Sequence, residues 1–160
     1  MIKRRRKIIS HVAAVELEIK DFACLEAACK TLGLVFHKGK KNYKWYGQWV
    51  GDYHGNDAAY KNGFDPKTYG KDAEHVISVA NNKNAYEIGV VKNPKTGKYH
   101  LSYDFWAGGN GLEKVVGKSC DSLCRQYAKE VAVKQVRRLG YTASVTTNAE
   151  GEIEITATKY

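Results

Sequence analysis

Two segments of the chain alternate apolar and polar residues on both sides of a turn, and they constrain the fold most. Residues 85–106 place "AYEIGVV" and "KYHLSYDFW" around "NPKTGK", a pattern typical of a β-hairpin. Residues 142–159 repeat the arrangement, with "TASVTT" and "EIEITATK" around "NAEG". Hairpins join antiparallel strands, whereas parallel strands need long crossover connections. The chain is therefore predicted to build an antiparallel sheet.

Two amphipathic helices interrupt the strands. The segment "DFACLEAACKTLG" has Asp21 as a helix N-cap and Gly33 as the residue that ends the helix. A longer helix is expected from about Ser119, its predicted N-cap, to Leu139, and Gly140 closes it. Further strands are expected within residues 11–20, 33–39 and 75–80. The order β-α-β-β-β-β-α-β-β predicts an α+β fold of two layers, a mainly antiparallel sheet with both helices on one face.

Length and composition favour one ordinary domain. The 160 residues, 43% hydrophobic and 27% charged, suit a single globular domain spanning residues 10–160, with a basic arm at 1–9 and a long aromatic and glycine-rich loop at about 40–74. No apolar run is long enough to cross a bilayer, and the basic start lacks the apolar core of a signal peptide. These features predict a cytoplasmic protein without a membrane partner.

The net charge of +9 is concentrated at the N-terminus. Five basic residues there leave only 21 basic and 17 acidic residues, or +4, on the rest of the chain. A basic arm of this kind either contacts phosphates, with a steep salt dependence, or is a solvated tail. The five candidate phosphate contacts are Lys3, Arg4, Arg5, Arg6 and Lys7.

The residue types that bind metals do not form a known motif. Four cysteines have C-x4-C and C-x3-C spacing within the expected helices, which favours buried reduced thiols over a zinc site. The acidic residues between 52 and 74 suit turns and solvated loops better than a cation site. We therefore expect no metal and no cofactor. The residues concerned are Cys24, Cys29, Cys120, Cys124, Asp52, Asp57, Asp65, Asp72 and Glu74.

Residues 41–70 hold eight of the eighteen aromatic side chains, interleaved with Lys, Gly, Asn and Asp. Exposed rings beside lysines suit stacking on nucleobases, because every base has a π-face and ammonium groups can meet phosphates. The leading hypothesis is a small binding protein for nucleic acid or a nucleotide. Its stacking candidates are Trp45, Tyr46, Trp49, Tyr53 and Trp106, and Lys41 and Lys44 join the arm as phosphate contacts.

Other roles for the same rings stay open. Aromatic residues can build a private core that holds a long loop in shape, and Trp and Tyr also anchor protein interfaces. The alternative function is thus a protein–protein interaction module that targets a host or phage protein. Ser, Cys and His nowhere combine in a known nucleophile signature, which favours a binding protein over an enzyme. An exposed hairpin strand could also pair edge to edge in a homodimer.

Several segments together resemble an uncharacterised family of tailed phages and bacteria. They are "SHVAAVELEIKDFACLEAACKTLG", "KWYGQWVGDY", "YEIGVV", "YDFWAGGNGLEKVVG" and "RQYAKEVAVKQVRRLGY". The family includes the hypothetical chloroplast reading frame thirty-five proteins, and the resemblance runs over nearly the whole chain from Ser10. The arm and "NDAAYKNGFDPKTY" depart from its pattern. The resemblance implies a single α+β domain, a phage or mobile-element source and hence the host cytoplasm. It implies no catalytic residues, since the family is a domain of unknown function.

Overall fold

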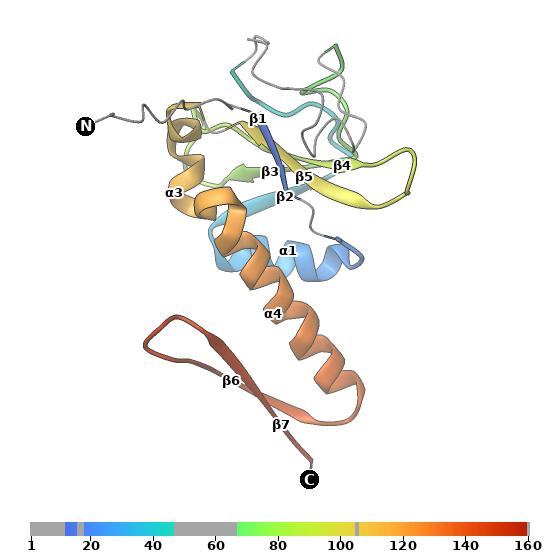
Figure 1. Cartoon of the computed structure of the whole chain (residues 1–160), viewed down its shortest axis with the longest axis vertical. Coiled ribbons are helices and arrows are strands. Elements are labelled where there is room, and N and C mark those ends of the chain that lie inside the picture. The colour runs from blue at the N-terminus through green and yellow to red at the C-terminus, as the bar shows by residue number, and fades with distance from the viewer. Residues whose placement is uncertain (1–11, 16–17, 47–66, 105, 160) are drawn as a thin grey trace, which may run out of the picture.

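The computed structural model describes residues 12–15, 18–46, 67–104 and 106–159. Five strands, two longer helices and a C-terminal hairpin follow one another along the chain (Figure 1). In chain order the elements are β1 (Val12–Val15), α1 (Phe22–Thr31), β2 (Leu34–Lys38), β3 (His75–Val79), β4 (Ile88–Lys92), β5 (Tyr99–Asp104), α3 (Leu112–Val116), α4 (Asp121–Arg138), β6 (Thr142–Thr147) and β7 (Ile153–Thr158). The α+β class and the strand order expected from the sequence are confirmed, with the short α3 in addition.

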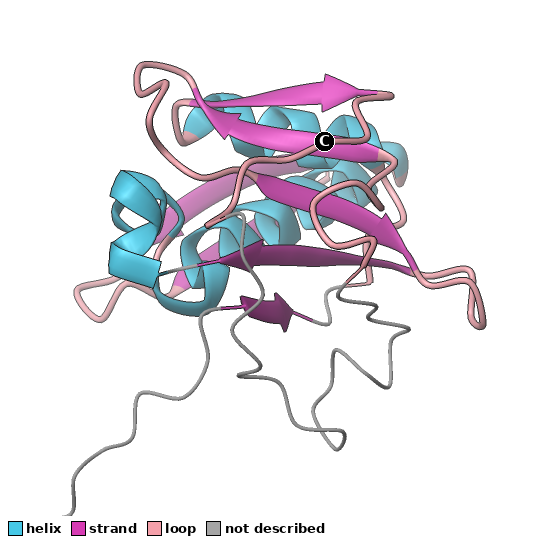
Figure 2. Ribbon diagram, turned by 90° about the horizontal axis from the view of Figure 1, so that it is seen from above, coloured by secondary structure: helices cyan, strands magenta, loops and turns pink. Residues whose placement is uncertain are grey.

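The main sheet has the strand order β1-β5-β4-β3-β2, and each described strand pair is antiparallel. Figure 2 shows these strands side by side, with the short β1 at one edge. The predicted hairpin is β4–β5, and its turn depends on Asn93: the side-chain Oδ1 accepts the N–H of Lys95 at 2.9 Å, and the backbone carbonyl accepts the N–H of Gly97 at 2.8 Å. Turn chemistry readable in the sequence therefore sets this hairpin.

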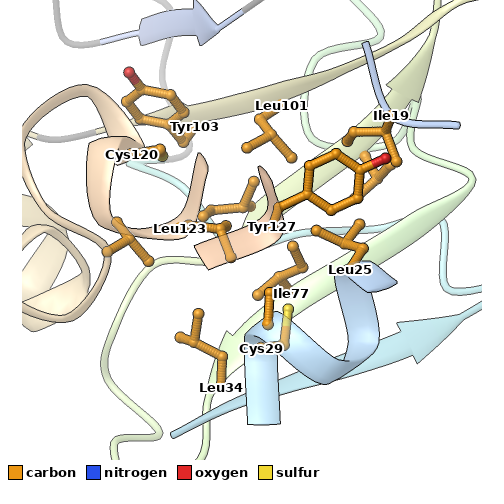
Figure 3. Close-up of a cluster of buried hydrophobic side chains, with 14 of the residues drawn as sticks. Ile19, Leu25, Cys29, Leu34, Ile77, Leu101, Tyr103, Cys120, Leu123 and Tyr127 are labelled. Carbon is orange, nitrogen blue, oxygen red and sulfur yellow. The ribbon is translucent and has the colours of Figure 1, made fainter. Parts of the chain in front are cut away.

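Helices α1 and α4 cover one face of the sheet and enclose the main core (Figure 3). Strand residues of alternate parity point toward the helices, so Ile77 lies opposite Ile88 and Val90 opposite Leu101 across the strand pairs. All four side chains are fully buried. The expected N-cap of α1 is confirmed, because Asp21 Oδ1 accepts the N–H of Cys24 at 3.0 Å.

The second face of the sheet is covered by the two described ends of the long connection, residues 39–46 and 67–74. Backbone bonds join them, from Tyr43 N to the Gly70 carbonyl at 2.9 Å and from Ala73 N to the Lys41 carbonyl at 3.3 Å. The Tyr43 ring lies directly on Gly89 of β4, where any Cβ would come within 2.4 Å of the ring. The aromatic rings thus hold these two segments on the sheet, as one interpretation of the sequence predicts.

The junction before α4 differs from the sequence prediction. Ser119 is not the N-cap: it has a φ of 53°, and the cap position belongs to Cys120, with a φ of 56° and no side-chain cap bond. These left-handed residues accompany the complete burial of the Cys120 side chain in the core. The gain from burying that side chain is a physical reason for the strained backbone, which costs about 1–2 kcal/mol per residue.

The C-terminal hairpin β6–β7 does not extend the main sheet. It forms a separate two-stranded sheet whose contacts are chiefly within itself and with α4, at the end of the molecule away from β1–β5 (Figure 1). The sequence predicts the hairpin, but it does not predict that the hairpin forms a sheet separate from β1–β5.

The four cysteines are free; Cys24, Cys29 and Cys120 are buried as the sequence predicts, whereas Cys124 is only half-buried. Burial raises the pKa of the Cys29 thiol to about 12, so this group stays protonated and unreactive near neutral pH. Within the described part of the chain, no helix has the length and apolarity needed to cross a membrane.

Candidate functional site

Tyr46 and Trp106 form a pair of exposed rings. Their centroids lie 4.9 Å apart with a 41° angle between the ring planes, and 38% of Tyr46 and 41% of Trp106 are exposed. Among the described residues, these two are the exposed members of the set of aromatic side chains predicted to stack on a ligand. The fold therefore brings together two candidate residues that are distant in the sequence.

The buried carboxylate of Asp104 binds the backbone of both ring-bearing residues. Asp104 ends β5 and is fully buried. Its Oδ2 accepts the N–H of Tyr46 at 3.0 Å, and its Oδ1 accepts the N–H of Trp106 at 2.8 Å. Hydrogen bonds to a carboxylate are short and strong, and a buried charge requires such partners. One side chain at a strand end thereby ties the two ring-bearing segments together.

A left-handed turn follows Trp106 directly in the chain. Four successive residues, Ala107 to Asn110, have φ between 51° and 68° with ψ between 17° and 39°. Such a conformation is costly for Ala and Asn and rarely extends beyond one residue. Strained backbone of this kind gathers at functional sites and needs support from the surrounding structure.

Contacts with the turn before β4 supply that support. The Gly109 carbonyl accepts the N–H of Tyr86 at 2.9 Å, and the Asn110 carbonyl accepts Nδ2 of Asn82 at 2.9 Å. At Gly109 an added Cβ would lie 3.0 Å from Leu112 Cβ and 3.2 Å from the Asp104 carbonyl oxygen. A side chain at this position would therefore press on both Leu112 and Asp104.

Trp45 is held apart from the exposed pair. Its ring is half-buried and meets Tyr69 edge to face, with centroids 4.7 Å apart and planes at 77°. It also covers Gly70 so closely that a Cβ there would lie 2.4 Å from Trp45 Nε1. Trp45 thus belongs to the packed layer with Tyr43 and Tyr69, which are 4% and 3% exposed. The stacking candidates Trp49 and Tyr53 lie outside the described residues.

Lysines lie on the segments next to the ring pair. Lys41 and Lys44 are exposed, and the Lys44 ammonium donates to the backbone carbonyl of Lys83. Glu87 orders the segment that holds both lysines, since its carboxylate accepts the N–H of Lys44 and Nζ of Lys40, both at 2.9 Å. The five arm residues Lys3 to Lys7 lie outside the described residues, so their part as phosphate contacts stays a prediction.

The two described acidic residues of the 52–74 segment act inside the protein. Asp72 accepts the Tyr43 hydroxyl at 2.9 Å, and Glu74 accepts the Tyr99 hydroxyl at 2.5 Å. Burial raises the pKa of the Tyr43 phenol, and the Asp72 charge raises it further. Over the part of the chain that the structure describes, no three His, Cys, Asp or Glu side chains gather as a metal site.

Sequence reasoning found both exposed rings but missed the residue that joins them. Asp104 reads in the sequence as an ordinary strand end, and its burial follows only from the folded arrangement. The available signal was the run "YDFWAGGNG", in which an Asp two residues before a Trp precedes glycines that can adopt positive φ.

Comparisons with protein-family models, with curated proteins and with solved structures found no match for this chain. The resemblance to the phage and bacterial family, with the phage source that it implies, therefore stays a prediction. So does the alternative role as a module that binds a host or phage protein.

Proposed function

We propose that the protein binds nucleobases by stacking them on the ring pair Tyr46–Trp106, either in single-stranded nucleic acid or in a free nucleotide. The observation that carries the proposal is that one buried carboxylate anchors the backbone of two residues whose rings are exposed. Both rings are about 40% exposed, and both backbone N–H groups bind Asp104. Because the backbone of both residues is fixed in this way, less conformational freedom is lost when a ligand binds, which favours affinity.

The surroundings of the pair suit an anionic ligand with a planar base. Aromatic stacking accepts any base, and it contributes about 1–3 kcal/mol per base. Lys41 and Lys44 on the adjoining segment are exposed, so their ammonium groups can meet phosphates. The polar turn with Asn82 and Lys83 links the two parts of the site. Asn82 donates to Asn110 in the left-handed turn after Trp106, and the Lys83 carbonyl accepts the Lys44 ammonium. In this arrangement stacking holds the base and the lysines hold the backbone.

The test is binding of a fluorescently labelled single-stranded oligonucleotide to the full chain, measured by anisotropy at several salt concentrations. Trp106→Ala and Tyr46→Ala should each weaken binding by about 10- to 100-fold at every salt concentration, because stacking is lost. The matched control is Tyr141→Ala, which removes a partly exposed ring between α4 and β6, at the other end of the molecule. This control should bind as the unmodified chain does.

The basic residues of the N-terminal arm should make the binding affinity depend on salt concentration. Deletion of residues 1–7 removes five charges and should lower the slope of log K against log salt by up to about 3.5, since each phosphate contact contributes about 0.7 for a single strand. If the oligonucleotide does not bind even at low salt but mononucleotides raise the melting temperature, the ligand is a free nucleotide. Absence of both effects refutes the proposal, as does equal binding by the ring variants and the control.

A further inference from the structure

The C-terminal hairpin lacks the packing that usually stabilises a two-stranded sheet. A hairpin needs more strands or a broad helix contact to be stable in water, yet α4 has no buried residue beyond Tyr127. The hairpin residues that face α4 are only half-buried, among them Val145 and Ile155. Leu139, at the end of α4, is 75% exposed. This end of the molecule therefore presents apolar surface that the described residues do not cover.

The hydrogen-bond pattern of the hairpin identifies the residues whose peptide groups face outward on β7. Asn148 N donates to the Glu152 carbonyl at 3.0 Å, so these two residues form a hydrogen-bonded pair. Bonded and non-bonded pairs alternate along an antiparallel ladder, and the register places Val145 opposite Ile155. The peptide groups of Ile153, Ile155 and Ala157 consequently point to the outer edge of β7.

We propose that β7 pairs antiparallel with β7 of a second copy of this chain, with Ile155 opposite Ile155 of the partner subunit. This register makes a four-stranded sheet across a two-fold axis. In this register the outward N–H and C=O groups of the two β7 edges hydrogen-bond to each other. The apolar sides of both hairpins then lie on one face together with the two copies of α4.

The distribution of charge along the hairpin favours a second copy of the chain as the partner, paired in this register. The hairpin tip carries Glu150 and Glu152, whereas Lys159 lies at the open end beside the basic end of α4, which holds Arg137 and Arg138. An antiparallel pair places the tip of each hairpin beside the open end of the other. With Ile155 on the axis, Lys159 comes beside Gly151 of the partner subunit, between the two glutamates.

Other choices of strand or register fit less well. A shift of the axis to Glu154 would place two glutamates directly opposite each other, which is unfavourable across strands. Strand β6, "TASVTT", has no charged residue, so a β6–β6 pair would gain nothing from the charges at the two ends. Outward peptide groups, apolar contact and complementary charge therefore all favour pairing at the β7 edge.

The decisive experiment compares two proline variants of the full chain by sedimentation over a wide concentration range. Ile155→Pro removes an outward N–H of β7 and leaves the ladder with β6 intact. Val145→Pro is the matched control, since it removes the equivalent outward N–H on the β6 edge of the same residue pair. We expect a dimer for the unmodified chain and for Val145→Pro, and a monomer for Ile155→Pro. Circular dichroism should show the same fold content in all three.

A charge reversal tests the register independently of folding. Lys159→Glu should raise the dimer dissociation constant by about tenfold at low salt, because two symmetric contacts are lost. Adding Glu150→Lys to the same chain should restore dimerisation. The proposal is overturned if the unmodified chain is monomeric up to about 1 mM, if Ile155→Pro still dimerises, or if the double charge variant dimerises no better than Lys159→Glu.

Discussion

Gly89→Ala is expected to destabilise the protein, although alanine suits this backbone. Gly89 lies in the middle of the sheet, opposite Val76 on β3 and Ser102 on β5. Its φ is not in the left-handed region, so a methyl group strains no backbone angle there. In open space the change would stabilise a strand by about 0.5–1 kcal/mol, because glycine loses more conformational freedom on folding. Any loss of stability must therefore arise from steric contacts between the new Cβ and neighbouring side chains.

The new Cβ would lie 2.4 Å from Tyr43 Cε1. Ordinary contact begins at 3.4 Å, so the ring would have to retreat by at least about 1 Å. The ring is 4% exposed, and its hydroxyl donates to Asp72 at 2.9 Å and lies 3.3 Å from Ser102 Oγ. Overpacking costs about 1–3 kcal/mol and a weakened buried hydrogen bond adds about 1 kcal/mol. After the backbone gain is subtracted, the net loss is about 2 kcal/mol.

Equilibrium unfolding in urea measures this loss. With a slope of about 2 kcal/mol per molar urea, the midpoint should fall by about 1 M. In a Tyr43→Val background, which lacks the three ring atoms concerned, Gly89→Ala should cost nothing, so the two changes should couple strongly. Gly39→Ala is the control: it has open space but a φ of 75°, and should cost about 1 kcal/mol whatever occupies position 43. An unchanged or raised midpoint for Gly89→Ala would refute the reasoning.

Two further predictions concern titratable groups. The hydrogen bond from Lys134 and the N–H of Cys24 lower the pKa of Asp21 from 3.8 to about 2. Because the folded pKa is lower than the unfolded one, the stabilisation is complete above about pH 4 and is lost as the pH falls through about 2. Asp21→Ala should therefore cost about 1 kcal/mol at pH 7 and much less at pH 2; a cost independent of pH, measured by urea unfolding, would contradict this. Burial raises the pKa of Cys29 to about 12 and also raises that of the half-buried Cys124. Iodoacetamide at pH 8 should alkylate Cys124 first by mass spectrometry, and equal rates at both thiols would argue against the buried core.

The sequence determined those parts of the fold that depend on neighbours along the chain. Asp21 and Gly33 bound α1 through cap and left-handed geometry, and Asn93 and Gly97 shape the turn of the β4–β5 hairpin. Alternating strands and the hairpin order also gave the antiparallel sheet. These features can be predicted because the hydrogen bonds of a β-turn or a helix cap join residues that are only a few positions apart in the sequence. The prediction of Ser119 as the N-cap of α4 was wrong, because burial of the Cys120 side chain outweighed the preference of serine for the N-cap position.

Only the tertiary structure decided which rings face solvent. Tyr43 and Tyr46 lie three residues apart on an irregular segment, yet one ring is 4% exposed and the other 38%. Gly89 makes room for the first ring, and Asp104 holds the backbone N–H of the second residue. The partners are more than forty residues away in the chain, and no periodicity of the segment encodes them. Side-chain direction in an irregular segment depends on such distant contacts, so composition indicated a ring-rich site and the fold selected Tyr46 and Trp106.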